Sequence, residues 1–174
     1  MPQHSNISLL SRVRTWFRNL FRKSKKNQNI SSVVFLPQDA CLMGGAFHIS
    51  LPPDFEFLRT TPEQTTLFGR KCGLILTINR TAFNGQLQQM TEDVFQHAFL
   101  QNLAIVEILS FRHDYVRHSP RVTVHYVNNM YNHVSQRCTT VLLQRKDFVY
   151  NLLFTGNIEQ NLALIDTMIS TMQT

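Results

Sequence analysis

Histidine and cysteine are the residues of this chain whose side chains could bind a metal ion or act as nucleophiles. Four of the seven histidines cluster in the sequence, at His113, His118, His125 and His133. None has the H-x-H or H-x-x-x-H spacing of a metal site, and no carboxylate pattern accompanies them. We therefore expect histidines on the surface of a sheet, with neither a metal ion nor a cofactor bound.

The three cysteines, Cys41, Cys72 and Cys138, stand far apart in the sequence. An odd number cannot form a fully paired disulfide framework, and no C-x-x-C motif is present. We expect three half-buried thiols in a reducing compartment. A thiol hydrolase built on Cys138 is the alternative, but it has no local sequence signature. The nucleotide-binding and hydrolase motifs GxxxxGK, GxGxxG, GxSxG and HExxH are absent too, so the sequence predicts no catalytic residues and no enzyme.

Charge is distributed unevenly along the 174 residues, although the formal net charge is only +6. Residues 1–38 contain seven Lys or Arg and no acidic residue, whereas the rest of the chain contains ten Lys or Arg and eleven Asp or Glu. The chain is therefore a nearly neutral globule that carries a strongly basic N-terminal segment.

The basic segment from Ser8 to Lys26 has the periodicity of an amphipathic helix, which we place at about residues 7–24. Its apolar residues recur at steps of three and four and cover an arc of roughly 140°. They are Leu9, Leu10, Val13, Trp16, Phe17, Leu20 and Phe21. The cations lie at the margins of that arc and opposite it, and those we expect to touch a binding partner are Arg12, Arg14, Arg18, Arg22 and Lys23.

An anionic membrane surface is the partner that this helix fits best. Its aromatic and leucine side chains would enter the acyl boundary, while its cations reach the phosphate level. Three alternatives remain open: docking on the protein's own globule, the acidic groove of a protein partner, and a nucleic acid. The segregation of aromatic residues from cations disfavours nucleic acid, and the absence of acidic residues disfavours an ordinary docked helix.

A short polar stretch, Asn27 to Ser32, predicts a hinge between the basic segment and the globule. We place the domain boundary near residue 30, which gives a helix and hinge at 1–30 and a domain at 31–174. No apolar run is long enough to span a bilayer, and arginines interrupt the stretch where a secretory signal would need its apolar core. We expect a cytoplasmic protein at the inner face of a membrane, or an organellar protein with a cleaved presequence.

Alternating apolar residues predict several strands in the globule. They lie at 45–51, 56–59, 72–80, 105–116 and around 122–126, followed by a hairpin of 137–143 and 148–154. Two helices interrupt this order. One is capped by Thr91, buries Val94, Phe95, Ala98, Phe99 and Leu103, and has Met90 stapled against Phe95. The other follows Gly156-Asn157 and buries Ile158, Leu162, Ile165, Ile169 and Met172.

Short turns join most of these strands, so consecutive strands must be antiparallel. The sequence therefore predicts an α+β fold: a mostly antiparallel sheet flanked by helices and preceded by the basic amphipathic helix.

Residues 45–173 resemble the PsbP-like superfamily, which includes the photosystem II extrinsic protein, Ran-binding Mog-type proteins and bacterial DcrB-like proteins. The resemblance rests on the opening F-H-I-S-L-P-P-D-F and on the closing strand, turn and helix, V-Y-N-L-L-F-T-G-N-I-E-Q-N-L-A-L-I-D-T-M-I-S-T-M. It implies an antiparallel sheet between helices and a non-enzymatic binding role, but it identifies no ligand residues. This chain differs from the secreted members and lipoproteins, because it has a basic helix in place of a signal peptide or lipobox.

Together these features predict an adaptor that its basic helix holds at a membrane surface or a protein partner. The resemblance to DcrB-like proteins adds a second hypothesis, a cytosolic chaperone for the apolar segment of a secretion-system effector.

Overall fold

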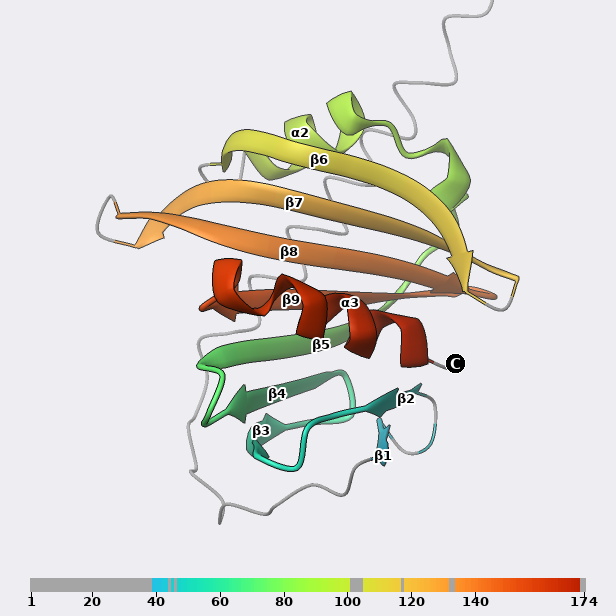
Figure 1. Cartoon of the computed structure of the whole chain (residues 1–174). Helices are drawn as coiled ribbons and strands as arrows, with labels where there is room; N and C mark the ends of the chain where they lie inside the picture. Colours follow the sequence, from blue (N-terminus) through green and yellow to red (C-terminus); the bar gives the residue numbers. More distant parts are fainter. Residues whose placement is uncertain are drawn as a thin grey trace, which may run out of the picture.

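A seven-stranded antiparallel sheet forms the centre of the molecule. The structure, a computed structural model, describes residues 39–43, 45, 47–100, 105–116, 118–131 and 134–172. The strand order is β3-β4-β5-β9-β8-β7-β6, and β1 and β2 form a separate two-stranded ladder. The strands are β1 (Asp39–Leu42), β2 (Phe47–Ser50), β3 (Phe55–Thr60), β4 (Gln64–Gly69), β5 (Leu74–Ala82), β6 (Ile105–Val116), β7 (Ser119–Tyr131), β8 (Val134–Arg145) and β9 (Phe148–Gly156) (Figure 1).

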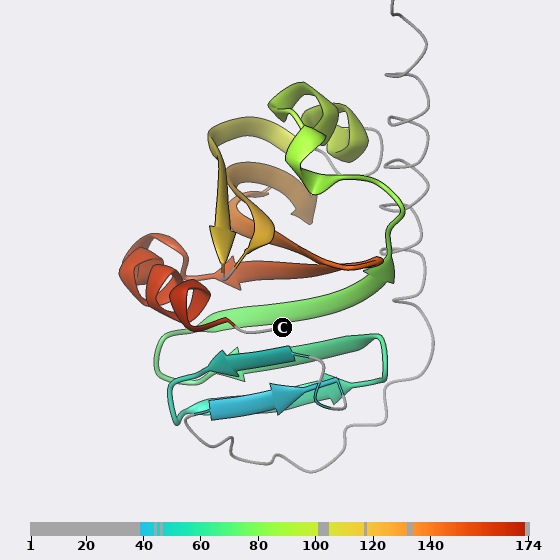
Figure 2. The same cartoon turned by 90° about the vertical axis from the view of Figure 1, so that its right-hand side faces the viewer.

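Helices lie on both faces of this sheet. The helix α3 (Leu162–Thr171), preceded by the 3₁₀ turn η3 (Glu159–Asn161), covers one face. The helix α2 (Glu92–Leu100) and the 3₁₀ turn η2 (Leu87–Gln89) lie on the opposite side (Figure 2). The predicted antiparallel sheet with flanking helices is confirmed. The predicted N-terminal helix lies outside the described residues.

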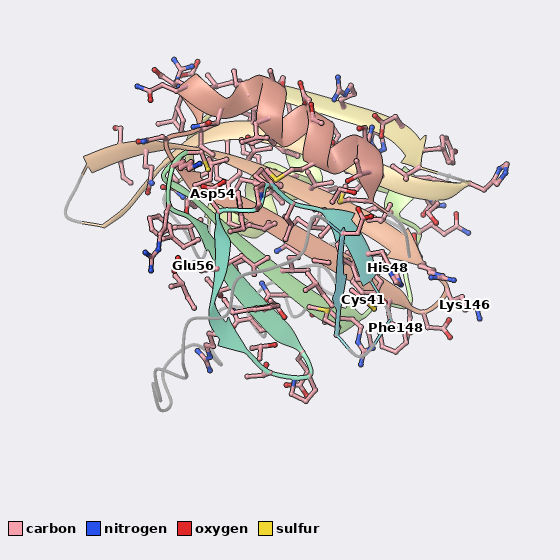
Figure 3. All side chains as sticks on the ribbon, turned by 60° about the horizontal axis from the view of Figure 1, so that its bottom comes forward. Cys41, His48, Asp54, Glu56, Lys146 and Phe148 are labelled. Atoms are coloured by element: carbon pink, nitrogen blue, oxygen red, sulfur yellow. The ribbon has the colours of Figure 1, made fainter. Side chains whose placement is uncertain are left out.

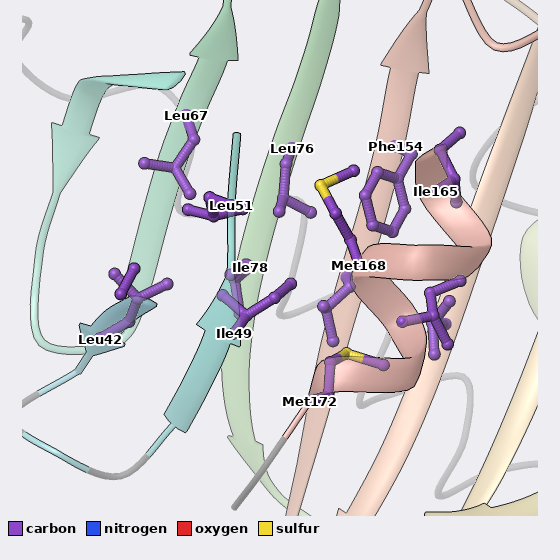
Figure 4. Packing of buried hydrophobic residues seen from close by; sticks show 14 of the residues in the cluster. Leu42, Ile49, Leu51, Leu67, Leu76, Ile78, Phe154, Ile165, Met168 and Met172 are labelled. Atoms are coloured by element: carbon purple, nitrogen blue, oxygen red, sulfur yellow. The ribbon is translucent and has the colours of Figure 1, made fainter. Parts of the chain in front are cut away.

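The larger hydrophobic core fills the space between the sheet, α3 and the β1–β2 ladder. Leu76, Ile78 and Phe154 project from the sheet and meet Ile165 and Met168 of α3 (Figure 4). The ladder closes one side of this core, and a hydrogen bond from the Ser50 amide to Thr171 Oγ1, at 3.0 Å, ties it to α3. Nearly all of these apolar side chains are removed from water, which is the main favourable contribution to folding.

A second core lies on the other face, beneath η2 and α2. Phe95 of α2 packs edge-to-face against Phe111 of β6 and Tyr126 of β7, with ring centroids about 6 Å apart. Met90 is buried in the same cluster as Phe95, which agrees with the predicted staple. The Thr91 hydroxyl accepts a hydrogen bond from the Val94 amide at 3.2 Å, so the predicted N-cap is confirmed.

The turn from β9 into the last helix depends on glycine. Gly156 has φ of +92°, and a Cβ added there would lie 2.2 Å from the Gly73 carbonyl oxygen. The Asn157 amide donates to that same carbonyl at 3.2 Å. Only glycine therefore fits at this position, and the last helix follows Gly156-Asn157 as the sequence predicts.

One residue of the predicted stripe on the last helix is exposed. Leu162 is 41% exposed, whereas Met168, which the stripe omitted, is buried. At about 100° per residue, Leu162 and Met168 lie roughly 60° to either side of Ile165. The buried stripe is centred toward Met168 and Met172, so Leu162 falls at its margin. On the other helix, Val94 is half-buried and Phe95 is buried, while the side chains of Ala98, Phe99 and Leu103 lie outside the description.

A pair of matched substitutions tests this core. We expect Leu76→Ala to lower the free energy of unfolding by about 2–5 kcal/mol, because it leaves a cavity beneath α3. Leu162→Ala makes the same chemical change at an exposed position and should cost less than about 1 kcal/mol. Urea denaturation of the two variants measures both values, and similar losses would contradict this description of the core.

Candidate interaction surfaces

The predicted binding residues of the basic segment, between Leu9 and Lys23, lie outside the described residues, and so does the predicted boundary near residue 30. Among the described residues, no helix combines the length and the hydropathy needed to cross a membrane.

The described members of the histidine cluster do not come together. His113 on β6 bonds through Nε2 to the Met90 carbonyl oxygen, 2.7 Å away, on the side of α2. His125 on β7 bonds through Nδ1 to Thr139 Oγ1, 2.8 Å away, on the side of α3. His118 lies in the turn between β6 and β7, and His133 is not described. In the part of the chain that the structure describes, no group of three or more His, Cys, Asp or Glu side chains could hold a metal ion.

The three thiols differ in exposure, so the expectation of three half-buried cysteines is wrong for two of them. Cys72 is half-buried as expected, but Cys138 is buried and Cys41 is exposed. Cys138 faces the core beneath α2, and burial raises its pKa to about 12. Cys41 lies on β1, a strand that the sequence analysis did not predict, with its side chain turned away from the core.

Cys41 stands directly opposite His48 of β2, with its Sγ 3.7 Å from His48 Nε2 (Figure 3). Sequence analysis missed this pair of a thiol and an imidazole, because seven residues separate the two and the strand β1 was not recognised. The signal that could have found it is the alternation of Ala40 and Leu42, which are both buried, around Cys41.

A row of polar side chains follows β6, β7 and β8 on the face that carries α3, which we call the polar patch. Its members are Arg112, Asp114, Arg121, Thr123, His125 and Thr139, and they share one face because they are partners in the strand register. Arg121 forms a two-pronged ion pair with Asp114, and Arg112 Nε lies 3.7 Å from the same carboxylate. Thr123 is buried, and its hydroxyl oxygen has no hydrogen-bond partner among the described residues.

Burial lowers the pKa of His125, because the half-buried site disfavours the imidazolium. The carboxylate of Asp166 on α3 opposes this effect, and the charge of Arg112 adds to it. At neutral pH this lowered pKa favours the neutral imidazole over the imidazolium. The polar patch thus presents neutral donors and acceptors beside one ion-pair network.

The opposite face of the sheet carries a different surface over β4, β5 and β9, which we call the mixed face. It combines apolar and polar side chains: Thr66, Phe68, Ile75, Thr77, Asn79, Asn151 and Leu153. All are half-buried except Asn151, which is buried and whose Oδ1 has no hydrogen-bond partner among the described residues. Such a surface can bind a chain that is largely apolar and also offers hydrogen-bond donors.

The sequence matches no family model and no curated protein. Its fold, however, is similar to several solved structures. The solution structure of cyanobacterial PsbP (CyanoP) from Synechocystis superimposes with a TM-score of 0.63 at 9% identity, covering 87% of this chain and 99% of that one. The crystal structure of the Ran-binding protein Mog1p from Saccharomyces cerevisiae has a TM-score of 0.56 at 10% identity, covering 80% of this chain and 96% of that one.

A crystal structure from Bacteroides thetaiotaomicron has a TM-score of 0.51 at 10% identity and covers 79% of this chain, but only 48% of its own chain is matched. At such low identities the likeness concerns the fold. The chain therefore has the PsbP-like fold, as its opening turn and closing strand and helix predict.

The thiols should differ strongly in reactivity. A pKa of about 12 leaves Cys138 with roughly a thousandth of the thiolate of an ordinary thiol at neutral pH. We expect a disulfide reagent such as DTNB to modify Cys41 first and to reach Cys138 only after unfolding. Mass spectrometry of partly labelled protein gives the order, and early labelling of Cys138 in the folded state would contradict it.

His125 should make stability depend on pH. Because its pKa is lower in the folded state than in the unfolded chain, the unfolded chain binds the proton more readily. The free energy of unfolding should therefore fall as the pH drops below the ordinary histidine pKa of about 6.5. Urea denaturation at about pH 7.5 and pH 5.5 should show a smaller fall for His125→Gln than for the wild type. An equal fall would assign the pH dependence to other groups.

Proposed function

We propose that this protein is a non-enzymatic binding protein, an adaptor whose basic amphipathic segment holds the α+β domain at an anionic membrane surface on the cytoplasmic side. The observation that carries the proposal is the separation of charge along the chain. Seven cations and no acid precede the first described strand, while the rest of the chain is nearly neutral.

Two contributions support binding of the segment to a membrane. Removing its apolar side chains from water is worth about 25 cal/mol per Å². Each cation near anionic lipid adds about 1 kcal/mol. Salt screens the second contribution but not the first. Binding should therefore weaken with salt without disappearing, whereas a purely electrostatic contact with nucleic acid would fall steeply.

A protein partner is the other candidate, and the mixed face favours it. Phe68, Ile75 and Leu153 leave apolar surface partly exposed on that face. Beside them lies the amide oxygen of Asn151, for which the described part of the chain supplies no hydrogen-bond partner. A chaperone that shields an apolar segment of a client needs a surface of this composition. Mog1p, which has a similar fold, is described as Ran-binding, so this fold supports binding of a protein in at least one case.

Vesicle sedimentation of the full chain tests the membrane hypothesis. We expect binding to rise with anionic lipid content and the fluorescence of Trp16, the only tryptophan, to shift to the blue. Trp16→Glu should abolish binding, because it places a charge at the centre of the apolar face, whereas Arg18→Gln should only weaken it. An unchanged spectrum, or a Trp16 already buried in the free protein, would support a helix docked on its own globule instead.

Deletion of residues 1–30 separates the adaptor from the chaperone. An adaptor should lose its membrane association, whereas a chaperone should still co-purify with a stoichiometric client.

A further inference from the structure

The outer strand β6 has an edge that no other described strand pairs with. It lies at the end of the sheet, where β7 is its only hydrogen-bonded neighbour within the described residues (Figure 1). Its register with β7 is irregular between Ile105 and Ser110 but regular from Ser110 to Val116. The opposite edge strand, β3, has six residues and an irregularity of its own. The half of β6 from Ser110 to Val116 is therefore the longest regular edge of this sheet.

Most edge strands discourage pairing with bulges, prolines or charged side chains, lysine above all. This half of β6 reads S-F-R-H-D-Y-V and contains neither proline nor lysine. Its two charges are of opposite sign and stand on either side of His113. Arg112 is exposed, and Asp114 is held in place by Arg121.

We propose that β6 pairs with β6 of a second copy of this chain, in an antiparallel two-fold arrangement centred on His113. The pairing joins two seven-stranded sheets into one continuous sheet. In this register Arg112 stands opposite Asp114 of the other copy, twice by symmetry. Phe111 stands opposite Tyr115, and Ser110 opposite Val116.

The alternation of faces supports this register. Residues directly opposite in an antiparallel pair project from the same face. Arg112 and Asp114 both belong to the polar patch, while Phe111 and Tyr115 are odd-numbered and project from the other face. The two complementary ion pairs therefore lie together on one face, and the aromatic residues lie on the other.

The neighbouring two-fold registers are unfavourable. A centre on Arg112 places this arginine opposite itself, and a centre on Asp114 does the same for the aspartate. Like charges directly opposite destabilise an antiparallel pair. Of these three registers, only the one centred on His113 makes every charged pair attractive.

The face of β6 that carries Phe111 and Tyr115 also gains contacts in the proposed dimer. Tyr115 is 62% exposed in the single chain, which is unusual for so large a ring. Across the two-fold axis it would reach Phe111, whose ring already packs on Phe95 at a centroid distance of 6.1 Å. The pairing therefore extends an existing aromatic cluster.

Analytical ultracentrifugation of the full chain over about 1 µM to 1 mM tests the pairing. We expect a concentration-dependent dimer. Arg112→Glu should weaken it by roughly tenfold or more, because it puts two acidic residues opposite one another. Arg145→Glu makes the same charge change at the exposed end of β8 and should leave the dimer intact. Trp16→Glu should also dimerise, which separates this contact from association through the basic segment.

Complementation of charge gives a sharper test. Asp114→Lys should weaken self-association in the same way, because the new lysine faces Arg112 of the other copy. An equimolar mixture of Arg112→Glu and Asp114→Lys should dimerise, since each charged pair across the axis is then attractive. Circular dichroism of each variant alone verifies that it is folded.

A cysteine at the axis reports the register directly. In a Cys41→Ser background, His113→Cys should form a disulfide between chains on mild oxidation, because residues directly opposite have Cα atoms within the range of a disulfide. Ser110→Cys should not, because in this register it faces Val116. A monomer at every concentration, a dimer that tolerates Arg112→Glu, or cross-linking at position 110 in place of 113 would overturn the proposal.

Discussion

The pairing of β9 with β5 on one side and β8 on the other holds the sheet together. Without β9, the hairpins β3-β4-β5 and β6-β7-β8 would be two separate units. Four consecutive residues of this strand, Val149 to Leu152, are buried, so the strand contributes to both cores at once. Tyr150 and Leu152 join the core beneath α3, and Val149 joins the one beneath α2. Both hydrophobic cores therefore depend on a strand near the C-terminus, which must be present before either is complete.

The same strand determines where polar surface remains. Because Gly156 turns the chain directly from β9 into η3 and α3, the last helix is confined to the face above β5 and β9. The strands β6 and β7 extend beyond that helix on the same face, and there the side chains change from aliphatic to Arg, Thr and His. The polar patch is thus a consequence of a short helix on a wide sheet.

The elements that sequence analysis predicted well are those whose signals are local. The strand at 105–116 matches β6 at both ends, the Thr91 cap is confirmed, and Gly156 ends β9 as expected. The strands β1 and β4 and the exposure of Leu162 were missed, because they depend on how the elements pair and pack. β1 is four residues long and is stabilised by its pairing with β2 and by the core. Leu162 is exposed because it lies at the margin of the α3 stripe, and which margin of a stripe is covered depends on how the helix packs on the sheet.

The candidate surfaces could be predicted less well than the fold. The basic segment can be recognised from composition alone, because residues 1–38 contain seven cations and no acidic residue. The pairing of Arg121 with Asp114, and of Cys41 with His48, requires the strand register, which short-range patterns do not fix. Exposure of a thiol depends likewise on which face its strand turns to the core.

The β1–β2 ladder is the first described structure after the basic segment, and this position has a mechanical consequence. Any tension on the residues before Asp39 acts on the open end of a four-pair ladder, where Asp39 stands opposite Ser50. A load applied there separates the four residue pairs of the ladder one after another from that end, instead of breaking all of them at once by shear. Ala40 and Leu42 would leave the core in turn, before the strands of the seven-stranded sheet begin to separate. The ladder can thus yield under force and extend the tether while the rest of the domain stays folded.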